Sequence, residues 1–146
     1  MPATRWIPAA LCGLAFCAAA ATAAAEPACR LPKTLAGRQM SNISDPLYRP
    51  DNPHAGRLAI VDFAAGTYRL RVAGSGREIQ GTYGYRLLDR HIAEVALVEA
   101  FDHRTSHYRL LLTCLDDHGG RFVFTQDDGP VAPRQRQNGG VWSLTR

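Results

Sequence analysis

The sequence predicts an all-β domain folded as a small antiparallel up-and-down β-barrel of seven or eight strands. Apolar and polar residues alternate over short runs, and this period of two is typical of strands with one buried face. Turn residues separate neighbouring runs, which favours strands paired in chain order, and no run has the pattern of a long amphipathic helix. Closing so small a sheet into a barrel removes its exposed edges, while a two-sheet sandwich is the main alternative.

The first 25 residues have the order of a secretory signal peptide. Arg5 precedes an alanine-rich apolar stretch, and the small residues Ala23 to Ala25 come directly before Glu26. This ending fits the A-x-A cleavage rule, so we expect residues 1–25 to be removed and the protein to be periplasmic or secreted. The apolar stretch is weakly hydrophobic and shorter than a spanning helix requires, so no stable membrane span is expected.

Two cysteines, Cys29 and Cys114, lie beyond the expected cleavage site. An even pair in an oxidising compartment predicts one disulfide between them. Closing so long a loop is worth about 4 kcal/mol when the effect is assigned to chain entropy. A metal site is the alternative, but it lacks the close second pair of ligands that such sites usually have.

The charge pattern indicates strand faces rather than a nucleic-acid surface. Removal of Arg5 leaves 16 of the 17 basic residues against 13 acidic ones, a net charge of +3. All of these basic residues except Lys33 are arginines, which are spread along the chain and alternate with apolar residues. Nucleic-acid binding would require a clustered basic stripe, so no nucleic-acid partner is predicted.

The segment over residues 26–56 has an irregular pattern. Prolines and Asn–Asp turn residues interrupt it, and we expect only one short strand there, from Leu35 to Ile43. This segment is therefore expected to cap a barrel that is formed mainly by residues 57–146.

The rest of the chain contains seven further strand-like runs. Gly81 and Gly84 fall inside one of them and predict a bulge or bend that helps the barrel to close. A polar loop over residues 127–139 is expected before the last run. The expected strands are residues 58–63, 67–73, 77–88, 91–98, 107–115, 121–126 and 140–145.

Several motifs in these strands resemble those of bacterial lipocalin-like domains. Val61 to Tyr68 reads V-D-F-A-A-G-T-Y and residues 81–85 read G-T-Y-G-Y, like the apolar-F-x-x-G-T-Y hairpin and following G-T-Y strand of that family. The resemblance covers residues 35–146, from the opening L-A-G to the late G-V-W strand. Arg38-Gln39 replaces the tryptophan that commonly follows the opening glycine. The resemblance implies a calycin-type barrel that binds a small, partly apolar ligand.

Large aromatic side chains gather on the apolar faces of the expected strands. Tyrosines suit a ligand cavity because each combines a flat apolar surface with a hydroxyl, although so many large rings in so short a chain favour a filled core slightly over an open cavity. Glu94 lies among apolar residues: pointing inward it would be a buried ligand contact, and pointing outward an ordinary surface charge. The candidate ligand-binding residues are Tyr68, Tyr83, Tyr85, Tyr108, Phe122, Phe124, Trp142 and Glu94.

The sequence has no signature of catalysis or metal binding. His103 and His107 have a suggestive spacing beside Asp102, but neither a closed ligand set nor an H-E-x-x-H motif is present. No serine lies in a G-x-S-x-G elbow. The sequence therefore predicts no enzyme, no metal and no cofactor.

A protein-binding module is the second class of function. Small disulfide-bonded barrels with an export signal also serve as periplasmic inhibitors of enzymes such as lysozyme, and the 127–139 loop would be the contact surface. The interior of the barrel discriminates between the two classes. A cavity lined by the tyrosines favours a small ligand, whereas a filled core beneath a protruding loop favours a protein partner.

Overall fold

The computed structural model describes residues 29–47, 52, 54–101, 103–130 and 132–146. The signal peptide expected over residues 1–25 lies outside the described residues. The strands are β1 (Arg38–Ser44), β2 (Leu58–Phe63), β3 (Thr67–Val72), β4 (Glu78–Asp89), β5 (Ile92–Phe101), β6 (Arg104–Cys114), β7 (Gly119–Asp128) and β8 (Arg136–Thr145).

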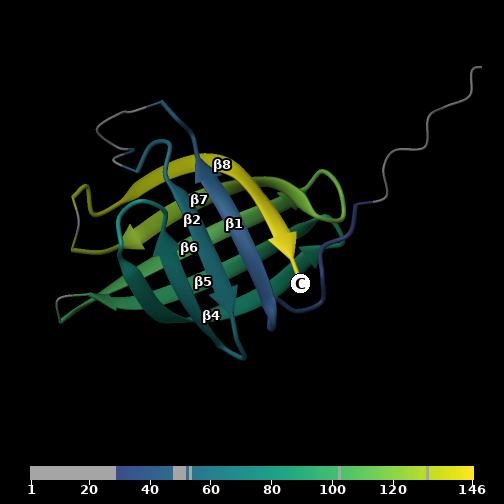
Figure 1. Cartoon of the computed structure of the whole chain (residues 1–146), viewed down its shortest axis with the longest axis horizontal. Coiled ribbons are helices and arrows are strands. Elements are labelled where there is room, and N and C mark those ends of the chain that lie inside the picture. Colours follow the sequence, from purple (N-terminus) through teal and green to yellow (C-terminus); the bar gives the residue numbers. More distant parts are fainter. Residues whose placement is uncertain (1–28, 48–51, 53, 102, 131) are drawn as a thin grey trace, which may run out of the picture.

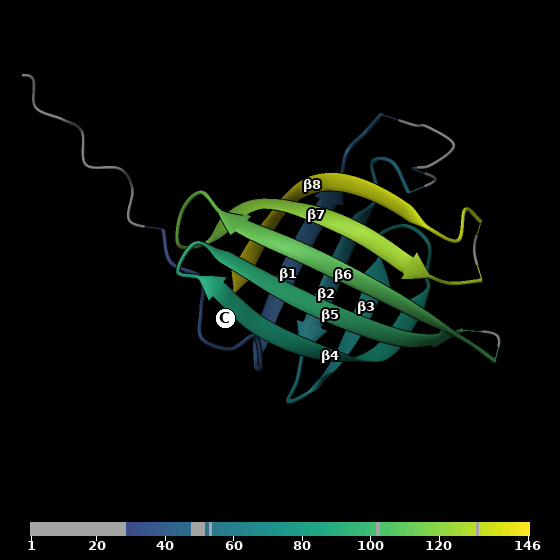
Figure 2. The ribbon, with the colours of Figure 1, turned by 180° about the vertical axis from the view of Figure 1, so that it is seen from behind.

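The eight strands form one closed antiparallel barrel in chain order (Figure 1). Each strand pairs with the next, and β8 pairs back with β1 through a ladder that includes Gln39 opposite Thr145. Figure 2 shows β4, β5, β6 and β7 side by side on one wall of the barrel. The predicted up-and-down barrel is therefore confirmed, and the sheet is not divided into the two layers of a sandwich. In the described part of the chain, no helix has the length and apolar character needed to cross a membrane.

The inner faces of the strands carry the apolar residues that the alternation predicted. On β3, Tyr68 is buried, whereas Arg69 and Arg71 are exposed. Leu31 and Leu35, which precede β1, join the same buried cluster, so the core extends to the end of the barrel that residues 29–37 cover. The buried cluster contains Leu31, Leu35, Met40, Val61, Phe63, Tyr68, Ala93, Val95, Leu97, Leu110, Leu112, Phe122, Trp142 and Leu144.

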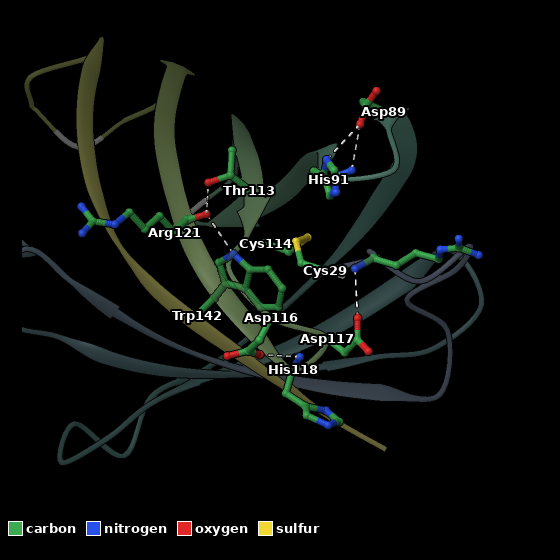
Figure 3. The surroundings of a disulfide bond; sticks show 11 residues. Cys29, Asp89, His91, Thr113, Cys114, Asp116, Asp117, His118, Arg121 and Trp142 are labelled. Carbon is green, nitrogen blue, oxygen red and sulfur yellow. Dashed lines mark hydrogen bonds and ion pairs between the residues drawn. A yellow bond between two sulfur atoms is a disulfide. The ribbon is translucent and has the colours of Figure 1, made fainter. Parts of the chain in front are cut away.

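A disulfide ties the covering segment, residues 29–37, to the end of β6. Cys29 and Cys114 are bonded with their Cα atoms 5.9 Å apart, which confirms the predicted pair. The N–H of Arg30 donates to Asp117 Oδ1 at 3.0 Å beside this bond (Figure 3). The hydroxyl of Tyr85 donates to the carbonyl of Pro32 at 2.7 Å, which holds the segment against the barrel interior. One end of the barrel is thus closed.

The other end of the barrel is framed by the connections β1–β2, β3–β4, β5–β6 and β7–β8, at the left of Figure 1. Several strands run further toward this end than the sequence indicated. β5 reaches Phe101 and β6 begins at Arg104, while β7 reaches Asp128 and β8 begins at Arg136. The expected polar loop over 127–139 is accordingly corrected to residues 129–135.

The physical reason for this difference is that the inner positions of these strand ends are polar. Glu99, Ser106, Arg136 and Asn138 lie where apolar residues would mark a strand, and three of them are buried. The apolar alternation therefore stops before the strands do. These strand ends, which the alternation did not predict, surround the open end of the barrel.

The irregularity expected in β4 lies elsewhere in the strand. Gly81 and Gly84 pair regularly with Glu99 and Ala96 of β5, so neither forms a bulge. The register shift falls between Leu87 and Asp89, next to the β4–β5 turn. Gly81 instead allows the ring of Tyr68 on β3 to approach the backbone of β4 closely.

Candidate ligand-binding site

A cavity of about 470 Å³ occupies the barrel and opens at the end opposite the disulfide. Its wall in the middle of the barrel is apolar and includes Val61, Leu97, Leu110 and Phe122. Nearer the open end the lining becomes polar and charged, because the inner positions of β5, β6 and β8 change from aliphatic to polar residues. The cavity therefore has an apolar interior and a polar mouth.

Glu99 on β5 presents a carboxylate to this cavity between two tyrosines. The hydroxyl of Tyr108 donates to Oε1 at 2.6 Å, and the hydroxyl of Tyr68 donates to Oε2 at 3.3 Å. Burial is the main cause that raises the pKa of Tyr108 to about 12, and hydrogen bonding to Glu99 adds to it. The pKa of Tyr68 is likewise raised, first by burial and then by the charge of Glu99. Both tyrosines are therefore neutral hydrogen-bond donors at neutral pH.

Arg136, the first residue of β8, places a guanidinium in the mouth of the cavity. The residue is only 6% exposed, and its guanidinium carbon lies 5.9 Å from the centre of the Phe124 ring. Nη2 lies 2.8 Å from His54 Nε2. Among the described residues, no hydrogen-bond partner reaches Nε or Nη1. The mouth thus contains a buried cation with unused donors.

The imidazole of His54 is uncharged at neutral pH. Burial is the largest cause that lowers its pKa from 6.5 to about 4, and repulsion from Arg136 is the second. Arg57 and Arg77, which also line the cavity, lower that pKa further. The charge at the mouth is therefore carried by arginines and by Glu99.

Two buried asparagines hold the connection between β1 and β2 in place beside His54. Asn138 on β8 donates from Nδ2 to Asn52 Oδ1 at 2.8 Å. Asn52 is fully buried, and its own Nδ2 donates to the carbonyl oxygens of Asp45 and Leu47 at 3.3 and 3.2 Å. These bonds fix the segment that carries His54 against the start of β8.

A buried amide also fixes the connection between β7 and β8. Gln126 on β7 donates from Nε2 to the carbonyls of Arg134 and Pro133 at 2.8 and 3.3 Å. The 129–135 connection is therefore bonded back to the barrel wall close to Arg136, which gives the polar mouth a defined shape.

Four of the predicted binding residues line the cavity, namely Tyr68, Tyr108, Phe122 and Phe124. Trp142, also a predicted binding residue, is buried outside the lining, and its Nε1 donates to the carbonyl of Arg121 at 2.9 Å. The two other predicted tyrosines, Tyr83 and Tyr85, also pack against the core outside the cavity lining.

The polar atoms of these two tyrosines are already satisfied by the backbone. Tyr83 packs edge-on against Phe63 with ring centres 4.8 Å apart, and its hydroxyl donates to the carbonyl of Ala64. Tyr85 donates to the covering segment as described above. Both residues, like Trp142, thus serve the packed part of the barrel.

Glu94 lies on the outer face of β5, outside the cavity lining. Arg86 Nη2 lies 3.2 Å from its Oε1 in a cross-strand ion pair. Of the two orientations considered from sequence, the outward one describes the structure. The carboxylate that faces the cavity is Glu99, five residues further along the same strand.

Sequence reasoning missed Glu99, Ser106, Arg136 and His54. A signal existed for Glu99, because the inward series Ala93, Val95 and Leu97 continues to it at the same period of two. Arg136 was assigned to a loop, and His54 lies in a segment without periodicity, so neither had such a signal.

The histidines considered as metal ligands are separated from this site. His103 and His107 are exposed, and Asp102 lies outside the described residues. Within the described ranges, no group of three or more His, Cys, Asp or Glu residues is arranged to hold a metal ion.

No family model, no curated protein and no solved structure matches this chain. The function is therefore inferred from the cavity and its lining.

Proposed function

We propose that the protein is an exported binding protein that holds a small, partly apolar ligand inside its barrel. The observation that carries this proposal is the cavity of about 470 Å³ lined by Tyr68 and Tyr108. Its size falls within the range of small-molecule sites, and eight-stranded barrels are wide enough to hold one such ligand. The Cys29–Cys114 disulfide fits an oxidising compartment such as the periplasm or the extracellular space.

The physical basis of binding is apolar burial in a preformed site. Each Å² of apolar surface that the ligand removes from water contributes roughly 25 cal/mol. The closed ladder and the hydrogen-bonded connections hold the cavity open before the ligand arrives, so little ordering is needed on binding. The polar groups at the mouth then fix the orientation of the ligand.

The motifs that resemble lipocalin-like domains agree with this proposal. The protein-binding alternative is less well supported, because a filled core beneath a protruding 127–139 loop would have favoured it. The interior contains a cavity, and the connection between β7 and β8 is shorter than expected and bonded to Gln126.

Native mass spectrometry of the protein, purified gently from a periplasm, tests the proposed function. We expect extra mass that disappears on denaturation. Leu97→Trp, which fills the cavity from β5, should abolish that mass, and Leu97→Phe is a milder filling change if the larger ring prevents folding. Val98→Trp is the matched control, because the neighbouring Val98 points outward. Bare protein mass in every preparation, or extra mass equally retained by the filled variants, would contradict ligand binding in the barrel.

A further inference from the structure

We propose that the ligand carries a single anionic oxygen group, such as a carboxylate, and that Arg136 binds this group at the mouth of the cavity. The inference rests on the proposed function, because it requires a ligand inside the barrel. It adds the chemical class of that ligand, which is an amphipathic organic acid.

The guanidinium of Arg136 is buried without the partner that a buried charge needs. Arginine is almost never buried unless it is paired, and a guanidinium can only donate hydrogen bonds. No carboxylate among the described residues forms an ion pair with Arg136, and its Nε and Nη1 have no acceptor there. Both nitrogens belong to a residue that lines the cavity. An acceptor that enters the cavity would bond to a donor of this guanidinium that has no partner in the described structure.

His54 adds a further donor without a partner to the lining of the cavity. Because Arg136 Nη2 can only donate, His54 Nε2 must accept that bond, so the proton of the neutral imidazole lies on Nδ1. His54 Nδ1 is also buried and has no partner among the described residues. Three donor nitrogens from two lining residues therefore lack acceptors among the described residues, and an anionic oxygen group supplies acceptors of the right kind.

The charge of the cavity favours an anion as well. Among the described residues, the charged residues of its lining are three arginines, Arg57, Arg77 and Arg136, against one carboxylate, Glu99. The oxygens of Glu99 already accept bonds from the hydroxyls of Tyr108 and Tyr68, so Glu99 is stabilised without Arg136. The described part of the lining therefore has more positive than negative groups, and Arg136 is the positive group that bears the unpaired donors.

The remainder of the cavity defines the rest of the ligand. The Phe124 ring lies against Arg136, and the lining continues into Leu97, Leu110 and Phe122. A ligand whose acidic group binds Arg136 would place its apolar part along these residues. A simple inorganic anion would leave that apolar wall in contact with water.

A comparison of head groups on one alkyl chain tests the inference. Decanoate and 1-decanol are titrated calorimetrically into the wild-type protein, into Arg136→Gln and into Arg134→Gln. Arg134 is the matched control, since it is exposed, pairs with Asp128 and lies outside the cavity lining. We expect the wild-type protein and Arg134→Gln to bind decanoate at least about tenfold more tightly than 1-decanol. Arg136→Gln should lose this preference while its affinity for 1-decanol stays within about twofold of wild type.

A second readout needs no variant. In nuclear magnetic resonance spectra of the wild-type protein, decanoate should shift the Arg136 Nε–H signal and 1-decanol should not. Equal affinities for the two compounds, or an Nε–H signal that decanoate leaves in place, overturns the assignment of the anionic group but leaves the barrel as a binding site. If neither compound binds and native mass spectrometry finds no carried ligand, the proposed function itself fails.

Discussion

Tyr68 lies across Gly81, the residue directly opposite it in the ladder between β3 and β4. A Cβ atom on Gly81 would lie 2.7 Å from Cε1 of the tyrosine ring, closer than non-bonded carbon atoms approach. The missing side chain lets the ring lie against the barrel wall with its hydroxyl directed to Glu99 on β5. Phe122 and Gly140 repeat the arrangement between β7 and β8, where the corresponding distance is 2.6 Å. Glycines thus make room for two of the rings that line the cavity.

Replacing Gly81 should therefore destabilise the barrel and disturb the cavity. Gly81→Ala places a methyl group against the Tyr68 ring and the carbonyl of Val98. We expect it to lower the free energy of unfolding by about 1–3 kcal/mol, as overpacking usually does. Urea unfolding measures the change. Gly84→Ala is the control in the same strand, because its Cβ would meet nothing within 4 Å and the effect should stay within about 1 kcal/mol. Equal losses in both variants would contradict the close-approach argument.

Removal of the disulfide should lower the free energy of unfolding for two reasons. The unfolded chain is no longer restricted, and the segment that covers one end of the barrel is no longer tied to β6. Cys29 and Cys114 are separated by 85 residues, and a loop of that length restricts the unfolded chain by about 4 kcal/mol. We expect the double substitution Cys29→Ser with Cys114→Ser to lose roughly this amount in urea unfolding. Reduction of the wild-type protein should reproduce the loss and leave the double variant unaffected. A double variant as stable as wild type would show that the covering segment is held by its other contacts.

At acid pH, protonation of His54 should lower the free energy of unfolding. The pKa of His54 is lowered by burial to about 4, below its ordinary value of 6.5. Between these two pH values the unfolded chain binds a proton that the folded protein excludes, so stability falls as the pH decreases through this window. Below the lower value both states are protonated and the loss is complete. His54→Gln should flatten the pH dependence of urea unfolding in this range. The exposed His118, at the closed end of the barrel, supplies the control substitution His118→Gln. If both variants retained the wild-type slope, His54 would not be its source.

At alkaline pH, loss of protons from buried tyrosines should lower the free energy of unfolding. The pKa of Tyr85 and that of Tyr108 are each raised from 10 to about 12, chiefly by burial. Above the lower value the unfolded chain loses these protons first, so stability falls as the pH rises from 10 to 12. An ultraviolet absorbance titration should show part of the tyrosine signal appearing only as the protein unfolds.

Two substitutions on opposite faces of β5 separate the effect of burial on the pKa of Tyr108 from the effect of its hydrogen bond to Glu99. Glu99→Gln removes the charge that the hydroxyl bonds to, so the pKa of Tyr108 should decrease while burial keeps it above 10. Glu94→Gln removes a carboxylate from the outer face and should leave the tyrosine titration as in wild type. Identical titrations in both variants would place Glu99 away from Tyr108.

The barrel could be predicted from sequence because its stability depends on patterns that a linear chain displays. Arg69 and Arg71 alternate with Tyr68 and Leu70, and this alternation is the signature of a wall with one face in water. The cysteine pair was similarly visible, because only Cys29 and Cys114 remain after the expected cleavage. Chain order and short turns then left few ways to pair the strands.

The polar mouth of the cavity could not be predicted because its residues break those patterns. The run around Glu94 is apolar on both faces, so the period of two places Glu94 and Glu99 on opposite faces but does not reveal which face points inward. That orientation follows from the register, which pairs Glu99 with Gly81 across one ladder and with Ser106 across the other. Arg136 could not be assigned to a strand for a different reason. A polar residue next to a polar loop resembles a continuation of that loop.

The disulfide-tied segment over one end of the barrel has a consequence for how long a ligand stays bound. A ligand that left sideways would have to separate two strands along a full ladder of backbone hydrogen bonds, and at the covered end the described residues 29–37 pack against the core. Entry and departure therefore share the single ring of connections around Arg136. Changes in those connections away from Arg136 would slow or speed arrival and departure together, so residence time could be altered while equilibrium affinity, set by the inner wall and by Arg136, stayed the same.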